Sequence, residues 1–181
     1  MRGIGYLSKE SLFRYSKALA EFGDIVGCYN LGCYYRDGEG TEVNHSEAFK
    51  CFQYAAERGY PKAQCNLGVC YNNGQGVEQN LVEAYFWYYV SILNNEPHAI
   101  RLTENLEKKL KTDDVNRIQD RAIKWLTDFR KSKGIPDKVE RFKVKTSKFY
   151  FGVIDNLNWT KTLDMFEARS KEDAISEFHR R

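Results

Sequence analysis

One stretch of this chain occurs twice at a fixed distance. Leu67–Asn80 reads LGVCYNNGQGVEQN, and Leu31–Asn44 reads LGCYYRDGEGTEVN. The offset is 36 residues (67 − 31 = 36). The same offset relates Gly38 to Gly74 within these stretches and four further pairs of identical residues outside them: Gly23 and Gly59, Asn30 and Asn66, Glu47 and Glu83, and Ala48 and Ala84. A constant period of this length indicates a solenoid of stacked helix pairs.

Each copy has the pattern of two helices joined by a glycine-containing loop. Gly38 and Gly74 stand where a first helix must end, because glycine reaches positive φ without a Cβ clash. Asn44 and Asn80 stand where a second helix begins, each with a glutamate three residues later, which is the capping-box pattern. The boundaries of the helix pair are therefore predicted twice, at equivalent positions.

The first helix of each copy has one apolar face. Its members recur at helical spacing and match between the copies: Gly27, Leu31 and Tyr35 in the first, and Ala63, Leu67 and Tyr71 in the second. Gly32 and Gly68 lie in these helices as well, and we expect them to let the paired second helix approach closely.

At these residues the chain resembles the Sel1-like repeat family, a relative of the tetratricopeptide repeat. The usual pattern of that family is Leu-Gly-x-x-Tyr, then Gly-x-Gly-Val, then an alanine-rich second helix. The second copy matches it closely through GQGV at 74–77 and EAYFWY at 83–88. The first copy departs from it, with Thr41 in place of the valine and Gly27 where an alanine is usual. The resemblance covers roughly residues 9–131 and implies a mainly α protein, an α-α superhelix.

The predicted organisation has three parts. Residues 9–131 form the solenoid, with a half repeat at 9–22, repeats at 23–58 and 59–94, and capping helices at 97–131. Ser8 to Phe22 is interpreted as the second helix of the half repeat, since apolar residues are helically spaced along it: Tyr15, Ala18, Leu19 and Phe22.

The capping helices follow a proline and an acidic stretch. One helix begins near Pro97 and carries Leu102, Leu106 and Leu110 as a stripe, and the Leu-Gly-x-x-Tyr signature does not return there. A second helix is expected to be capped by the residues from Thr112 to Asp114. It carries six apolar residues on one face: Val115, Ile118, Ala122, Trp125, Leu126 and Phe129.

Beyond Gly134 the residue pattern changes. Residues 132–140 are predicted to be a linker, and residues 141–181 a small β-β-α domain. Strands are expected at 142–154 and 160–168, around a turn at 155–158, because β-branched and aromatic residues dominate there. A closing helix is expected after Ser170.

Composition gives weaker constraints. The 181 residues carry a formal net charge of +3, with a sequence pI near 8.5, which is far from the strong basic bias of a dedicated nucleic-acid binder. No segment is long and apolar enough to predict a signal peptide or a membrane span. We therefore expect a soluble cytoplasmic protein, unless a leader was removed. Five cysteines, an odd number, favour reduced thiols over a disulfide set.

No residue pattern predicts catalysis, a metal site or a cofactor. The three histidines, His45, His98 and His179, are widely separated, and no Cys-x-x-Cys pattern occurs. The glycine pairs lack the lysine and serine of a phosphate loop, and no serine has a lysine three residues later. The chain is therefore predicted not to be an enzyme.

A basic stripe allows a nucleic-acid interpretation. It comprises Lys108, Lys109, Lys111, Arg117, Arg121 and Lys124, and the tail adds Arg141, Lys143, Lys145 and Lys148 beside Phe149 and Tyr150. Cations next to aromatic residues can contact phosphates and stack on bases. Acidic residues are interleaved with the first group, so a solvated, salt-bridged helix face is the preferred interpretation.

The function that the resemblance implies is a non-catalytic scaffold that binds a peptide or protein in a concave groove formed by the first helices. Eight residues off their packing face are the candidates: Val26, Tyr29, Cys33, Arg36, Lys62, Cys65, Val69 and Asn72. The valines and Tyr29 would bury area in a partner, the cations would meet acidic groups, and Asn72 would hold backbone.

Three alternatives stay open at this point. Cys33, Cys65 and Val69 can simply pack against neighbouring helices. The chain can instead be an inhibitor or immunity-type protein in which residues 141–181 make the contact, since a hairpin edge can extend another sheet. Copies of the chain can also self-associate, which would enlarge the small groove.

Overall fold

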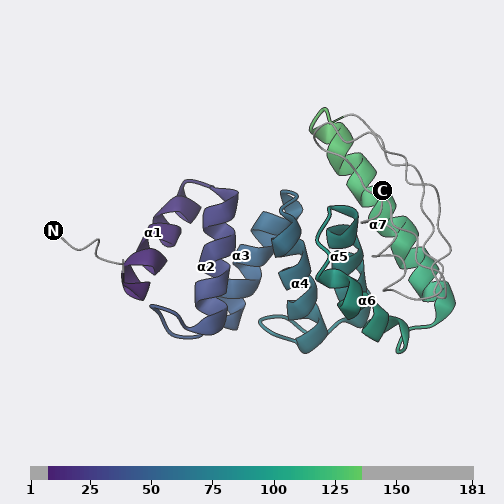
Figure 1. Ribbon diagram of the computed structural model, residues 1–181, viewed down its shortest axis with the longest axis horizontal. Helices are drawn as coiled ribbons and strands as arrows, with labels where there is room; N and C mark the ends of the chain where they lie inside the picture. The colour runs from purple at the N-terminus through teal and green to yellow at the C-terminus, as the bar shows by residue number, and fades with distance from the viewer. Residues whose placement is uncertain (1–7, 136–181) are drawn as a thin grey trace, which may run out of the picture. The chain divides into compact units, whose positions relative to one another are not determined.

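The computed structural model describes residues 8–135, and every regular element in that range is an α-helix. Figure 1 shows the helices in chain order. Their bounds are α1 Lys9–Glu21, α2 Ile25–Asp37, α3 His45–Glu57, α4 Pro61–Asn73, α5 Leu81–Leu93, α6 Ala99–Glu107 and α7 Thr112–Ser132. The predicted β-hairpin and helix of residues 141–181 lie outside the described residues.

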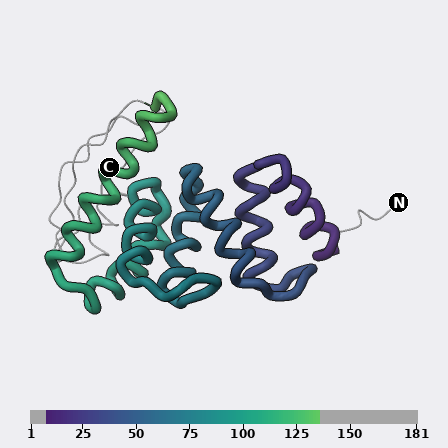
Figure 2. Tube along the Cα trace, turned by 180° about the vertical axis from the view of Figure 1, so that it is seen from behind, coloured from purple at the N-terminus to yellow at the C-terminus, as the bar shows by residue number. Residues whose placement is uncertain are grey.

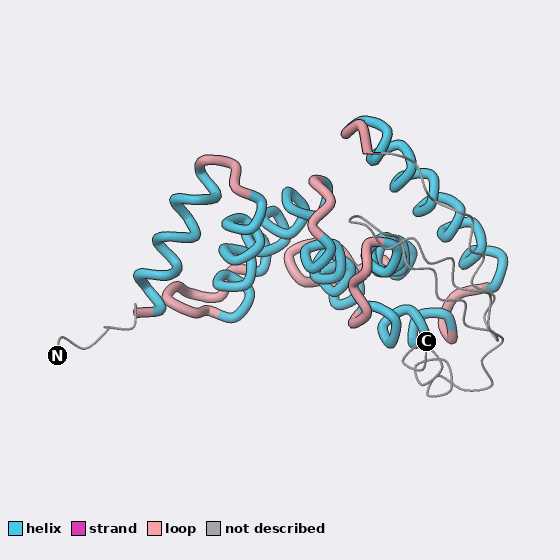
Figure 3. The backbone as a smooth tube through the Cα atoms, turned by 45° about the horizontal axis from the view of Figure 1, so that its top comes forward, coloured by secondary structure: helices cyan, strands magenta, loops and turns pink. Residues whose placement is uncertain are grey.

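The chain divides into two compact units, residues 1–129 and 130–181, and the first contains the helical array. Within it each helix from α1 to α5 packs against the next one along the chain. Figures 1 and 2 show this side-by-side order from opposite directions. Figure 3 shows short loops between helices, with no strand in the range 8–135. A layered stack of helix pairs is what the repeat period predicts.

Side chains cap the helix starts at the predicted positions. Oδ1 of Asn44 accepts a hydrogen bond from the backbone N–H of Glu47 at 3.0 Å. Oδ1 of Asn80 accepts from the N–H of Glu83 at 3.1 Å. Ser8 caps α1 in the same way. These bonds satisfy backbone donors that the first turn leaves without partners, so the predicted helix starts are confirmed.

The glycine loop contacts the preceding repeat. Gly38 and Gly74 end α2 and α4 in the left-handed conformation, both with φ of 69°, which confirms the predicted helix ends. A Cβ on Gly76 would overlap the carbonyl oxygen of His45 in the first turn of α3, and one on Gly40 would overlap that of Lys9 in the first turn of α1. Each loop therefore lies directly against the backbone of the previous second helix.

Close approach within each helix pair also depends on glycine. A Cβ on Gly32 would come within 2.7 Å of the Phe52 ring, and one on Gly68 within 2.5 Å of the Tyr88 ring. Phe52 and Tyr88 are fully or almost fully buried and 36 residues apart. The expected role of Gly32 and Gly68 is confirmed: each leaves space for one large ring of the paired helix.

The turn between repeats occurs three times with the same geometry. Its hydrogen bond runs from Asp24 N to Leu19 O, from Tyr60 N to Ala55 O, and from Glu96 N to Ser91 O, at 3.1, 3.0 and 3.0 Å. The residue before each donor has positive φ: Gly23, Gly59 and Asn95, at 78°, 87° and 64°. The turn before α6 is therefore in register with the turns before α2 and α4, although α6 itself begins at Ala99, two residues after the register position Pro97.

Helix α5 is the centre of the core. Eight consecutive residues from Ala84 to Ser91 are buried, so all faces of the helix are covered. Trp125 of α7 lies 5.4 Å from Trp87 and 6.4 Å from Phe86, measured between ring centroids. The predicted apolar face of α7 is confirmed, since four of its six residues are buried: Val115, Ile118, Ala122 and Leu126.

Two predictions about the helices after α5 need correction. Helix α6 ends at Glu107, so Leu110 does not continue the stripe of Leu102 and Leu106. Helix α7 begins at Thr112, which places Asp113 and Asp114 in its first turn rather than before it. Acidic residues in a first turn still stabilise the helix, because they face the positive end of its dipole.

The apolar residues that predict α1 are mostly exposed. Tyr15 is 62% and Phe22 is 90% exposed, and Ala18 is exposed too, whereas Ser16 is buried. Helical spacing gave the correct helix here but did not identify the side that packs.

Candidate functional site

The eight candidate residues lie on α2 and α4, the first helices of the two repeats. None of them belongs to the buried core: Val26 and Lys62 are exposed, and the other six are half-buried, namely Tyr29, Cys33, Arg36, Cys65, Val69 and Asn72. We call the surface that these eight residues and Asn66 form the α2–α4 face. The alternation of buried and accessible residues along both helices follows from their packing against α3 and α5.

Arg36 joins the two helices of this face. Its Nε and Nη2 donate to the two carboxylate oxygens of Asp37 at 2.8 and 2.7 Å, and its Nη1 donates to Oδ1 of Asn66 on α4 at 3.2 Å. The guanidinium carbon lies 6.0 Å from the centre of the Phe52 ring. The hydrogen bonds from Arg36 hold the pKa of Asp37 below its usual value. Arg36 is thus a fixed cation that is already paired with Asp37. An acidic group of a partner would have to share the guanidinium with the Asp37 carboxylate.

Tyr29 is held in place by two other rings. Its centroid lies 5.0 Å from that of Tyr60 in an edge-to-face arrangement and 6.0 Å from that of Phe52. Burial, with a smaller effect of Cys33, raises the pKa of Tyr29 to about 12, so the hydroxyl is a neutral hydrogen-bonding group at physiological pH. A preoriented aromatic side chain costs little entropy when it contacts a ligand.

The two thiols of the face are partly withdrawn from solvent. Burial raises the pKa of Cys33, and burial together with the nearby charge of Glu96 raises that of Cys65 to about 11. These shifts favour the open interpretation that Cys33 and Cys65 contribute to packing. They also keep both thiols protonated, which makes them poor nucleophiles.

Two asparagines provide the polar part of the face. Nδ2 of Asn72 donates to Oδ1 of Asn73 at 2.7 Å, and its backbone oxygen accepts from Nε2 of Gln79 at 2.6 Å. Asn66 was not among the predicted site residues. Its signal was present in the sequence, because Asn30 and Asn66 are identical at the repeat distance although neither is part of a cap.

The basic stripe on α7 is partly neutralised by acidic residues. Nη2 of Arg121 lies 2.8 Å from Oε2 of Glu83 on α5, and its guanidinium carbon lies 4.0 Å from the centre of the Phe86 ring. Nη1 of Arg117 lies 3.8 Å from Oδ1 of Asp114. The predicted salt-bridged helix face is confirmed at these two arginines, while the basic tail residues from Arg141 onward lie outside the described range.

Metal ligands, apolar helices and thiols are the remaining features of residues 8–135 that bear on function. That range contains no group of three or more histidine, cysteine or acidic side chains placed to bind a metal ion. None of its helices is long and apolar enough to cross a membrane. All five cysteines are free thiols.

Helix pairs repeated in register, with glycine loops seated on the preceding pair, define an α-solenoid of short repeats. The Sel1 repeat model matches residues 25–60 and 61–95, two residues later than the predicted start of the first repeat. The chain therefore contains two Sel1 repeats. Proteins with these repeats are generally non-catalytic scaffolds for protein–protein interactions.

Two solved structures share the fold. One is a protective antigen present in uropathogenic Escherichia coli strains displaying an SLR fold, with 22% identity, a TM-score of 0.63, and coverage of 75% of this chain and 31% of that protein. The other is a Sel1 repeat protein from Oxalobacter formigenes, with 25% identity, a TM-score of 0.55, and coverage of 70% of this chain and 51% of that protein. The chain thus spans about a third and about half of the length of these proteins. Comparison with the curated proteins gives no match.

Proposed function

We propose that this protein is a non-catalytic scaffold or adaptor that binds a peptide or a protein segment on the α2–α4 face. The observation that carries the proposal is the hydrogen bond between Arg36 and Asn66, which joins the first helices of successive repeats on the side that carries the candidate residues. First helices present their unpacked side in proteins of this architecture, and such surfaces bind extended or helical segments.

The residues of the face supply complementary contacts. Val26, which is 48% exposed, offers apolar area on α2, and the half-buried Val69 offers apolar area on α4. Lys62 is an exposed cation at the start of α4 and can meet an acidic group of the ligand. The amides of Asn66 and Asn72 can hydrogen-bond to a peptide backbone. The size of two short helices fits a peptide-sized ligand, because a 13-residue helix is about 20 Å long.

Site-specific photo-crosslinking tests this assignment. A photoreactive residue is introduced at Val26, at Val69, or at Lys50 on α3 as the control, since the Lys50 side chain is 65% exposed and lies on a second helix. We expect one and the same protein to crosslink from positions 26 and 69 in cell lysate and not from position 50. Adducts from position 50 alone would contradict the proposal.

Substitutions add a second measurement on the crosslinked partner. Val26→Asp combined with Lys62→Glu changes only exposed side chains, whereas Tyr29→Ala would also remove ring contacts with Tyr60. We expect the double substitution to lower affinity at least tenfold, with Lys50→Glu as the control for charge. A chain that ends at Gly134 should still bind the partner. If only this truncation lost binding, residues 141–181 would be the binding segment, which is the alternative considered above.

A further inference from the structure

Helix α1 occupies the position of a second helix, and within the described residues 8–135 no first helix precedes it. Phe13 of α1 meets Tyr35 of α2 edge-to-face at 5.4 Å, and Phe49 of α3 meets Tyr71 of α4 edge-to-face at 5.5 Å. Both members of the second pair lie 36 residues after those of the first. Helix α1 therefore packs on α2 as α3 packs on α4, and its opposite side corresponds to the side of α3 that α2 covers.

The covered side of α3 identifies the open side of α1. Gly32 of α2 lies against Phe52 and Cys51, and the hydroxyl of Tyr54 donates to the carbonyl oxygen of Gly23 at 3.2 Å. Ser16, which is 36 residues before Phe52, is buried. The residues of α1 at the positions of Cys51 and Tyr54 are Tyr15 and Ala18. No helix of the described range 8–135 precedes α1, so both residues are exposed.

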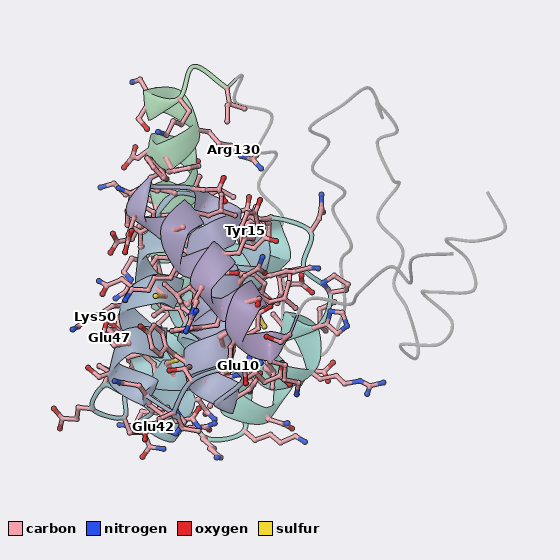
Figure 4. The ribbon with its side chains drawn as sticks, turned by 90° about the vertical axis from the view of Figure 1, so that its left-hand side faces the viewer. Glu10, Tyr15, Glu42, Glu47, Lys50 and Arg130 are labelled. Atoms are coloured by element: carbon pink, nitrogen blue, oxygen red, sulfur yellow. The ribbon has the colours of Figure 1, made fainter. Side chains whose placement is uncertain are left out.

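The open side of α1 is apolar where solenoid ends normally carry polar residues. Phe22 is 90% and Tyr15 is 62% exposed, and Ala18 lies between them on the same side. Figure 4 looks directly at this end of the array, with α1 in front and Tyr15 labelled on it. We call the surface formed by Ser11, Tyr15, Ala18 and Phe22 the α1 end face.

We propose that a second copy of this chain covers the α1 end face, with the two α1 helices antiparallel across a two-fold axis. The four residues are spaced by four, three and four positions, which is the spacing of a coiled-coil seam. Small and large residues alternate along it. An antiparallel pair places Tyr15 against the partner's Ala18 and Phe22 against the partner's Ser11, so that each large side chain meets a small one.

Charges beside the seam favour the same arrangement. Arg14 and Glu21 are both exposed. Arg14 directly precedes Tyr15, and Glu21 directly precedes Phe22. The two charged residues are seven positions apart, which places them on the same flank of the helix. In an antiparallel pair the same flanks of the two helices meet. Arg14 then faces the partner's Glu21, and two-fold symmetry forms the pair twice. A parallel pair would place these flanks on opposite sides.

The size of the face determines how tight the dimer is. Helix α1 has 13 residues and is therefore about 20 Å long. One helix per copy gives an interface at the small end of the range for specific complexes, which is typical of weak and reversible association. The dimer is thus expected at high protein concentration and low salt, because exposed ion pairs are screened by salt.

Charge exchange across the interface tests the register directly. Sedimentation equilibrium of the full chain is measured over a range from micromolar to near-millimolar protein. Arg14→Glu alone and Glu21→Arg alone each place like charges opposite each other and should weaken the dimer. An equimolar mixture of the two variants restores both ion pairs, as does the double variant with itself. We expect the mixture to associate roughly threefold to tenfold more tightly than either single variant.

Two controls make each outcome decisive. Lys17→Glu changes the net charge as Arg14→Glu does but on an exposed residue off the flank, so it should leave the dimer intact. Phe22→Glu should abolish the dimer without lowering the melting temperature. A chain that is monomeric at every concentration, or a mixture that associates no better than its components, overturns the proposal. A Phe22→Glu variant that has a lower melting temperature but the same mass in sedimentation equilibrium as the parent protein also overturns the proposal. That result would show that another segment of the same chain covers the face.

Discussion

Arg36 on α2 and Asn66 on α4 are joined by a hydrogen bond of 3.2 Å between the guanidinium Nη1 and the amide Oδ1. The two residues belong to successive repeats, and the same guanidinium is held by both carboxylate oxygens of Asp37. In a solenoid, stability comes from the repeats and from the interfaces between neighbours. This contact therefore serves the interface between repeats as well as the surface proposed to bind a partner.

Removing the amide of Asn66 should weaken that interface. We expect Asn66→Ala to lower the free energy of unfolding by about 0.5–1.5 kcal/mol, because the bond to a charged donor is lost in a half-buried place. Asn30→Ala, at the equivalent position of α2, is the matched control and should cost less. Urea unfolding of both variants, combined with Arg36→Lys in a double-mutant cycle, gives the coupling energy. A coupling energy indistinguishable from zero would contradict the role assigned to the bond.

The loop glycines give a prediction that separates backbone conformation from contact. Gly74 and Gly76 have similar φ, 69° and 74°, but a Cβ on Gly74 meets nothing closer than 3.5 Å, whereas one on Gly76 overlaps the backbone of His45. Gly74→Ala should therefore cost about 1 kcal/mol for the left-handed conformation alone. Gly76→Ala should lower the free energy of unfolding by roughly a further 1–3 kcal/mol, because the new Cβ would push the loop away from the preceding repeat. Equal losses in equilibrium unfolding would show that the loop is not fixed by the preceding helix.

Local signals explain how much of the fold could be predicted. Asn44 and Asn80 cap helices through their own neighbours, and Gly38 and Gly74 end helices through their own φ. Such features are visible in sequence because the chain repeats them at a fixed offset. The start of α6 was found only from Pro97, since Asn95 takes the place of the turn glycine. Asparagine tolerates the left-handed conformation, so the turn persists without its signature.

Predictions that depended on distant contacts were less complete. The spacing of Tyr15 and Phe22 indicated a helix but not that its apolar side would be exposed, because exposure depends on which helices are present beside it. For the candidate site, register predicted accessible positions, and all eight residues lie outside the buried core on α2 and α4, while their role in binding stays a prediction. It could not identify Asp37 and Asn66 as the partners of Arg36, because several side chains lie within reach of a long guanidinium group.

A buried hydrogen-bond chain gives a third prediction. The hydroxyl of Tyr85 on α5 donates to Oε1 of Glu107 on α6 at 2.7 Å and accepts from Nε2 of Gln119 on α7 at 2.8 Å. Tyr85→Phe leaves the buried Gln119 amide without this acceptor, which should cost about 1–3 kcal/mol of unfolding free energy. Adding Gln119→Leu should recover part of that loss. Tyr15→Phe removes an exposed hydroxyl and should be nearly neutral in the same thermal or urea unfolding series.

Buried thiols make the stability of the fold depend on alkaline pH. Burial raises the pKa of Cys70, which is 4% exposed, to about 11. A cysteine in the unfolded chain has a pKa of about 8.5. Below that value both states hold the proton and stability does not change. Above it the unfolded state loses the proton first, so the free energy of unfolding falls as pH rises towards the folded pKa, by at most about 1.4 kcal/mol per pH unit for this thiol.

Urea unfolding between pH 7.5 and 9.5 measures this effect before tyrosines of the unfolded chain ionise. Cys51 and Cys65 should add slopes of the same sign, since burial raises the pKa of Cys51 to about 12 and burial together with the charge of Glu96 raises that of Cys65 to about 11. Cys70→Ala should lower stability at pH 7.5 through the space it leaves and should flatten the decline above pH 8.5. Alkylation of the native protein should stay slow over the same range because the thiols remain protonated. If the stability of Cys70→Ala declined with pH as steeply as that of the parent protein, the pH dependence would come from groups other than Cys70.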